Sequence, residues 1–177
     1  MKISEETMIS NKELQEQYIS RVDVLDKVKD LFLIPAMECM TPKQVADYYE
    51  VPVDTIRTTY KMNREELVSD GAVTRSIGDI KSLIGCESTY QNITNCRGGI
   101  EITIDENTKV FIPNAGIILY PKRAILRVGM LLRDSVIAKE VRTQLLNIVE
   151  VAQEEKPEII TQQIQKEEDL LLNISKA

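Results

Sequence analysis

A short segment near residue 55 carries side chains of the kinds that hydrogen-bond to nucleic-acid bases. On a helix these residues point away from its apolar side, so they are available to a ligand. Arginine and lysine donate to guanine, and threonine contacts several bases, while further basic side chains bind phosphates. The predicted base contacts are Thr55, Arg57, Thr58 and Lys61, and the predicted phosphate contacts are Lys43 and Arg64. The chemistry favours double-stranded DNA as the partner.

A helix-turn-helix over residues 41–60 would position these side chains. Thr41 followed by Pro42 is typical of a helix start, because threonine caps free N–H groups and proline has none to leave unpaired. Ala46 is the small residue required where two helices cross closely. An ordinary pair of packed helices is the alternative interpretation.

The second helix of this unit is expected to begin after Val51, where Pro52 breaks the first helix and Asp54 can cap the next. It should continue to about Tyr60. Glu50 occupies the position where such a turn usually has glycine, so a looser turn is expected.

Residue types needed for most catalytic and metal sites are scarce. The chain has no histidine, which removes the most common general base and metal ligand. Its cysteines, Cys39, Cys86 and Cys96, are widely spaced, so we interpret them as structural thiols. We therefore predict no enzymatic activity, no metal site and no cofactor.

Charge is distributed unevenly along the 177 residues, whose net charge is -6. Residues 1–40 contain five Lys or Arg and eight Asp or Glu, whereas residues 109–146 contain seven and two. A local basic segment in an acidic chain is consistent with localised DNA contacts. The polar start and the absence of a long apolar run predict a cytoplasmic protein without a membrane partner.

The rest of the chain predicts a mainly α fold of the α+β class. Residues 1–10 are expected to fray, and residues 11–32 to form one long amphipathic helix that ends before Pro35. Its apolar stripe suits either the core or a dimer contact. Asn63 and Glu66 predict a capping box for a third helix that stops at Gly71, which would complete a head at 11–71.

Beyond the head, residues 72–99 read as a connector with at most one or two helical turns. A small α+β domain is predicted at 100–152, beginning with three antiparallel strands at 100–104, 109–112 and 117–120. Two helices separated at Asp134-Ser135 follow over residues 121–147. Their predicted second basic face consists of Lys122, Arg123, Arg127, Arg133, Lys139 and Arg142.

This basic segment resembles phage and prophage antirepressors and regulators of the BRO and Rha kinds. The shared pattern is Asp134-Ser135, Ala138, Val141 and Arg142, within a match of some 28 residues. The chain departs from the BRO pattern because it contains no tryptophan. The resemblance implies a mobile-element regulator that binds DNA, other regulators, or both.

Residues 157–174 are predicted to form a C-terminal docking or dimerisation helix, because a lone helix of this length is marginal in water. The sequence thus favours a homodimeric transcriptional regulator that binds specific DNA sites. The alternative is a protein-binding antirepressor, or an inhibitor of a host defence protein, acting through residues 100–177. In that alternative the head would serve autoregulation.

Overall fold

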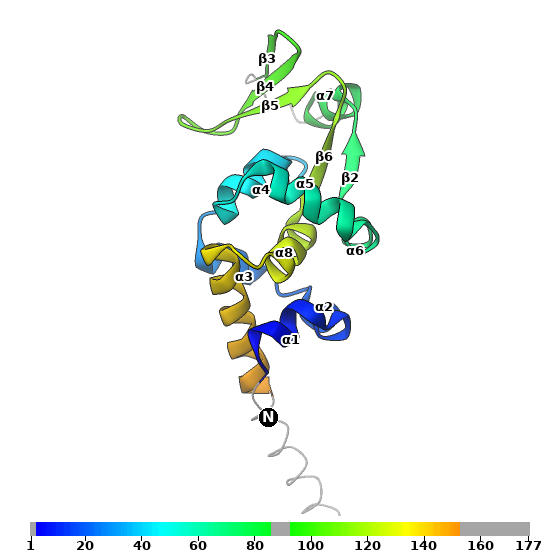
Figure 1. The fold of residues 1–177 in the computed structure, drawn as a ribbon. Coiled ribbons are helices and arrows are strands. Elements are labelled where there is room, and N and C mark those ends of the chain that lie inside the picture. The colour runs from blue at the N-terminus through cyan, green and yellow to red at the C-terminus, as the bar shows by residue number, and fades with distance from the viewer. Residues whose placement is uncertain (1–2, 86–92, 153–177) are drawn as a thin grey trace, which may run out of the picture.

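The computed structural model describes residues 3–85 and 93–152, which form a mixed α+β fold with two small antiparallel sheets. Helices make up the lower part of the molecule in Figure 1, and a sheet with one helix lies above them. The elements in chain order are α1 (Glu5–Ser10), α2 (Lys12–Tyr18), α3 (Asp23–Val28), β1 (Cys39–Met40), α4 (Pro42–Tyr49), α5 (Val53–Met62), α6 (Arg64–Ser69), β2 (Val73–Arg75), α7 (Ile77–Gly85), β3 (Ile93–Cys96), β4 (Gly99–Thr103), β5 (Lys109–Pro113), β6 (Ile117–Pro121), α8 (Lys122–Leu131) and a helix over residues 136–152.

The prediction of one long helix over residues 11–32 is wrong, because two short helices, α2 and α3, occupy this region and α1 precedes it. Asn11 lies at a boundary: its side chain accepts a hydrogen bond from the N–H of Leu14 at 3.1 Å and caps α2. Ser4 caps α1 in the same way, so residues 5–10 are helical rather than frayed. The Asn11 cap competes with a continuous helix and explains the break between α1 and α2, whereas α3 begins at Asp23 without a side-chain cap. The chain leaves α3 at Val28, well before Pro35.

The apolar stripe predicted for this region nevertheless packs into the core. Leu25 is fully buried, and the hydroxyl of Tyr48 in α4 donates a hydrogen bond to its carbonyl oxygen at 2.7 Å. Tyr18 belongs to the same buried cluster, and the other members of the predicted stripe, Leu14, Val22 and Val28, are partly buried against it. These residues are therefore core contacts within one chain.

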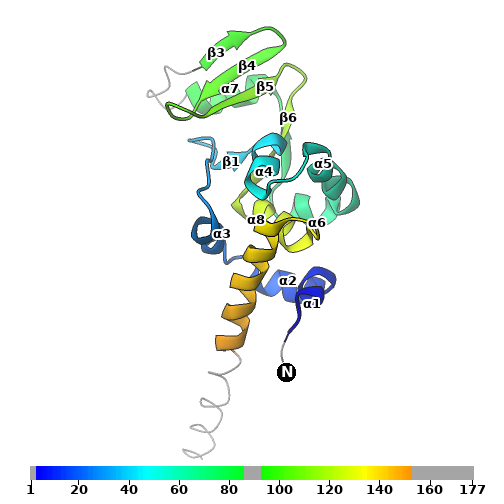
Figure 2. The ribbon, with the colours of Figure 1, turned by 60° about the vertical axis from the view of Figure 1, so that its left-hand side comes forward.

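Helix α8 lies at the centre of the helical part, between α4 and α6 and next to the helix over 136–152 (Figures 1 and 2). Every residue from Ala124 to Met130 is buried, as expected for a helix surrounded on all sides. Its core cluster joins residues from α1 through α6 to residues of α8 and of the following helix. The first 70 residues and the last described helices thus share one apolar core.

The strands at 99–103, 109–113 and 117–121 form close to their predicted positions, but they do not share one sheet. The pairing orders are β3-β4-β5 and β1-β6-β2. Strand β6 leaves the hairpin and pairs with β1 and β2, which precede it by more than 40 residues. The alternating pattern predicted strands correctly, whereas their partners depend on contacts distant in sequence.

The segment predicted as a connector contains β2 and the nine-residue helix α7, so it is more ordered than expected. Ile80 and Ile84 of α7 are fully buried against Ile100, Ile102 and other residues of the upper sheet. Leu119 of β6 joins this cluster, while its neighbour Tyr120 joins the helical core. Consecutive residues of a strand face opposite sides, so β6 links both cores.

Candidate nucleic-acid interface

Helix α4 begins as predicted, with Thr41 at the N-cap and Pro42 at the first helical position. The hydroxyl of Thr41 accepts from the N–H of Gln44 at 3.3 Å, and the Gln44 side chain accepts from the N–H of Thr41 at 2.9 Å. This reciprocal capping box satisfies two N–H groups at the helix start. The Gln44 amide also donates to the carbonyl of Phe32 at 2.8 Å. These contacts fix the first turn of α4, which exposes Lys43.

The turn after α4 is tight despite the absence of glycine. Glu50 adopts the left-handed conformation, with φ 55 and ψ 45 degrees, which is the geometry of the usual glycine. The N–H of Val51 donates to the carbonyl of Ala46 at 3.0 Å, and this closes the turn. Ala46 itself is 2% exposed, as predicted for the small residue between the helices.

Helix α5 follows directly and ends at Met62, two residues later than expected. Pro52 occupies its N-cap without a side-chain cap, so Asp54 does not act as the predicted cap. Ile56 is fully buried, whereas Arg57, Thr58 and Lys61 are exposed. Thr55 is half-buried. Three of the four predicted base contacts therefore share the solvent side of α5.

Carboxylates on the same helices accompany two of these cations. Arg57 donates to Asp54 at 3.0 Å, and Lys43 donates to Asp47 at 3.3 Å. Exposed pairs of this kind contribute at most about 1 kcal/mol, so a phosphate can replace the carboxylate at little cost. Lys61 and Arg64 have no ion pair within residues 3–85 and 93–152. These two cations carry the uncompensated charge of the surface.

The third helix, α6, starts after Asn63, but the predicted capping box is absent. Glu66 instead accepts from Lys12 of α2, and this hydrogen bond is the main reason that its pKa is lowered. Gly71, with φ of +100 degrees, follows the helix and supplies the predicted stop.

The predicted second basic face forms only in part, because two of its six members are buried. Arg127 and Arg142 are 0% and 2% exposed, although the sequence pattern placed both at the surface. Arg127 donates to Asp70 of the α6 end at 2.7 Å and also contacts Gln15 and Glu16 of α2. Acidic partners distant in sequence make burial of a guanidinium possible.

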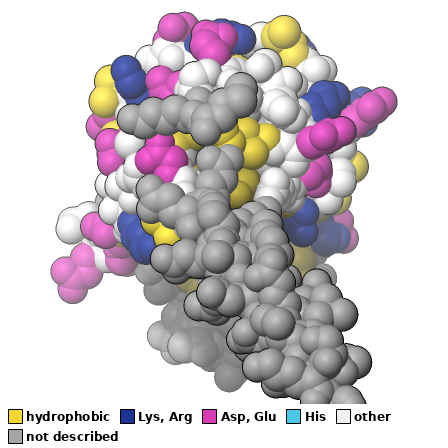
Figure 3. All heavy atoms as spheres, turned by 90° about the horizontal axis from the view of Figure 1, so that it is seen from below, with side chains coloured by type: hydrophobic (Ala, Val, Ile, Leu, Met, Phe, Trp, Pro, Cys, Tyr) yellow, Lys and Arg dark blue, Asp and Glu magenta, His cyan; other side chains and the backbone are white. Residues whose placement is uncertain are grey.

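The other members of the set are mostly paired with the acidic N-terminal region. Arg142 lies 3.2 Å from Glu5, and Arg133 lies 3.2 Å from Glu6. Two longer ion pairs, each of 3.9 Å, connect Lys122 with Asp26 and Arg123 with Asp70. Lys139 is exposed and has no ion pair in the described part of the chain. Seen from below, basic and acidic side chains are interspersed (Figure 3).

These pairs explain the uneven charge of the sequence. The acidic residues of the first 40 positions and the basic residues of 109–146 face each other across the helical part. Burial alone would lower the pKa of Arg127, but hydrogen bonds to Asp70 and Glu16 outweigh burial, so this pKa is raised. Much of the basic segment is thus neutralised within the molecule.

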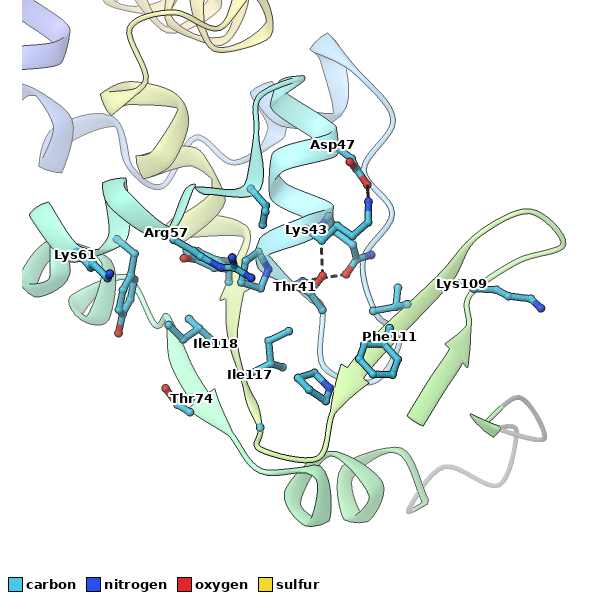
Figure 4. A pocket seen from close by; sticks show the side chains of 18 residues that line it. Thr41, Lys43, Asp47, Arg57, Lys61, Thr74, Lys109, Phe111, Ile117 and Ile118 are labelled. Carbon is cyan, nitrogen blue, oxygen red and sulfur yellow. Dashed lines mark hydrogen bonds and ion pairs between the residues drawn. The ribbon is translucent and has the colours of Figure 1, made fainter. Parts of the chain in front are cut away.

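A groove of about 830 Å³ adjoins α4 and α5. Figure 4 shows Arg57 and Lys61 on one side, Phe111 of β5 on the other, and Ile117 and Ile118 between them. The sequence pattern predicted none of these three apolar residues as part of a site. The available signal was Phe111, which is apolar on the outward side of a strand whose Val110 and Ile112 are buried.

Neither Cys39 nor Cys96 forms a disulfide, and Cys86 lies outside the described residues. Within the described ranges, no cluster of three or more His, Cys, Asp or Glu residues can hold a metal ion. The predicted helix at 157–174 also lies outside the described residues. No described helix is long and apolar enough to cross a membrane.

Comparison of the chain with protein-family models, curated proteins and solved structures finds no match.

Proposed function

We propose that this protein is a sequence-specific DNA-binding regulator that reads bases through α5. The observation that carries the proposal is the exposure of Arg57, Thr58 and Lys61 on one side of α5, opposite the fully buried Ile56. A recognition helix must present such a face to the major groove while its other face is anchored. The tight turn at Glu50 and the buried Ala46 anchor α5 against α4.

Phosphate contacts belong to Lys43 and Arg64, which are exposed at the start of α4 and of α6. Half-buried Thr55 lies at the edge of the proposed interface rather than at its centre. A homodimer would place two α5 helices on successive major-groove faces of a pseudo-palindromic site. The resemblance of the basic segment to phage regulators supports a cytoplasmic, mobile-element role.

Selection of bound sites from random double-stranded DNA tests the proposal. Recovery of a motif is expected, and its symmetry will report whether two copies bind. Failure to enrich any motif at physiological salt would contradict sequence-specific binding.

Substitution of Arg57 then tests the assigned face. Arg57→Ala should weaken binding to the selected site by about 1 to 3 kcal/mol, measured by fluorescence anisotropy. Lys81→Ala is the matched control, because Lys81 is exposed on α7 and does not line the groove. Equal affinities of the two variants would show that α5 is not the reading helix.

A protein-binding antirepressor or inhibitor is the second candidate. The specific observation in its favour is the neutralisation of the basic segment, which reduces the cationic surface available to DNA. Its test requires the full chain, since a fragment 72–177 would lose the core contacts made by α1 to α6. The full chain should then bind no DNA in the selection and should form a stoichiometric complex with a purified regulator or defence protein.

A further inference from the structure

The groove beside α5 has two walls of different chemistry. One wall consists of α4 and α5, and the other of β5 and the start of β6 (Figure 4). Its volume of about 830 Å³ lies within the range of roughly 300 to 1,000 Å³ that is typical of small-molecule sites. The volume is therefore large enough for an organic ligand.

The floor and the β5 wall are apolar. Ile117 and Ile118 are half-buried. The side chain of Phe111 is 48% exposed, although it is large and apolar. An exposed aromatic side chain that lines a concave surface is a common sign of a binding site. Transfer of a ligand's apolar body onto this floor would remove apolar surface from water.

The α4 and α5 wall is cationic. Lys43, Arg57 and Lys61 line it, and Asp47 is the single carboxylate among the lining residues. Lys61 has no ion pair in the described part of the chain, so its charge is available. Lys109 also lines the groove, but it pairs with Glu101 at 3.4 Å and points away in Figure 4. Arg57 is paired with Asp54 at 3.0 Å and Lys43 with Asp47 at 3.3 Å, so Lys61 gives the wall one uncompensated positive charge, which favours an anionic ligand.

We propose that this groove binds a small organic anion with an apolar body. The carboxylate lies at Arg57 and Lys61, and the apolar body crosses Ile117 and Ile118 toward Phe111. Binding at this site does not depend on DNA. If the protein also binds DNA through α5, the ligand and DNA compete for Arg57 and Lys61, and this expectation rests on the proposed function.

Titration of the isotopically labelled full chain with decanoate and with 2-naphthoate, followed by NMR of backbone amides, tests the site. Saturable shifts are expected in α5, β5 and β6, and decylammonium should bind at least about fivefold more weakly because its charge is reversed. The proposal would be overturned if neither carboxylate shows saturable binding, or if decylammonium binds as tightly as decanoate. Shifts in the same amides that depend on protein concentration alone would assign the groove to a second copy and would also overturn it.

Two variants locate the ligand within the groove. Phe111→Ser and Lys61→Glu should each weaken carboxylate binding about fivefold, since one removes apolar contact and the other reverses a charge. Val136→Ser and Lys81→Glu are the matched controls, because both residues are exposed outside the groove, and they should bind like the parent. Equal losses in variants and controls would contradict the assigned position.

Anisotropy with the selected DNA separates this proposal from the proposed function. Displacement of DNA by decanoate supports both. Carboxylate binding by a chain that selects no DNA site supports the ligand site and contradicts DNA reading. DNA binding by a chain that binds neither carboxylate supports DNA reading and contradicts the ligand site.

Discussion

Arg127 connects three elements of the helical part through a single guanidinium. It is fully buried in α8, and its partners are Asp70 after α6 and Gln15 and Glu16 in α2. Removal of two charges from water has a large free-energy cost. A buried ion pair offsets this cost only when its geometry is good and the surrounding hydrogen bonds are complete. The loss of one partner leaves the other charge unpaired in the core.

Arg127→Met should accordingly destabilise the protein by about 3 to 5 kcal/mol, measured by urea denaturation. Asp70, whose side chain is 1% exposed, would remain without its main partner. Addition of Asp70→Asn to Arg127→Met should recover part of the loss. Arg133→Met is the control, because Arg133 is 60% exposed, and it should change stability by no more than about 0.5 kcal/mol. Equal costs for both arginines would refute a structural role for the buried pair.

Glu66 makes stability depend on pH at the acidic end. The hydrogen bond from Lys12 lowers the Glu66 pKa in the folded state below its ordinary value of 4.5. A lowered carboxylate pKa adds stability above pH 4.5, and this contribution disappears as pH falls through the folded-state pKa. The stability difference between the parent and Glu66→Gln should therefore shrink between pH 6 and pH 3 in denaturation experiments. Glu13→Gln, which removes an exposed carboxylate, is the control; an identical trend in both variants would exclude the Glu66 contact as the cause.

Exposure of single residues was only partly predictable. The spacing of apolar positions correctly predicted exposed Arg123, Arg133 and Lys139, but it failed at Arg127 and Arg142. Helical periodicity reports which residues share a face, and it does not report whether that face meets water or acidic partners. For Arg142 the partner, Glu5, is 137 positions away.

At the level of elements, the contact between α4 and α8 depends on one small residue. A Cβ added to Gly129 would clash with the hydroxyl oxygen of Tyr49. That hydroxyl donates to the carbonyl of Ile125 at 2.6 Å, and the Tyr49 ring is fully buried. Close packing of the two helices therefore requires glycine here.

Gly129→Ala should lower the unfolding free energy by about 1 to 3 kcal/mol, even though alanine favours helix. Gly78→Ala is the matched control on α7, where the nearest atom to an added Cβ is 3.8 Å away. The control should be neutral or stabilising, since it introduces no clash. Thermal unfolding followed by circular dichroism compares them, and a Gly129→Ala protein as stable as Gly78→Ala would contradict the packing constraint.

Element boundaries were predicted well where local chemistry sets them. Thr41-Pro42 and the stop at Gly71 are decided by residues within one helical turn. The length of α7 and the pairing of β6 depend on packing partners far along the chain. The groove has one wall of each kind. Its α5 wall was predicted from local sequence, whereas the contribution of β5 was not.

At the scale of the whole molecule, the helical core is shared by both ends of the chain. Tyr49 and Leu67 belong to the same buried cluster as Ile125 and Val141. The sequence predicted a separate head at 11–71, because its helices have the apolar faces of a minimal three-helix unit. Those faces contact α8 as well as each other.

Fragments 1–71 and 72–177 should therefore each unfold without a cooperative transition. Each would expose apolar surface that the other covers, and small units bury too little surface to remain stable alone. Circular dichroism and near-ultraviolet melts of the two fragments, compared with an equimolar mixture and the full chain, provide the measurement. A cooperative melt of fragment 1–71 would establish an independent head.

The central position of α8 also determines when this protein can fold during its synthesis. Asp70 and its partner Arg127 are 57 positions apart, so at about 5 to 20 residues per second the ribosome needs roughly 3 to 11 seconds to make one after the other. During that interval α4 can form its own capping box, since both partners are already present. Tyr49 and Leu67, in contrast, have no α8 to pack against. The nascent first half should consequently expose apolar side chains to chaperones until α8 emerges.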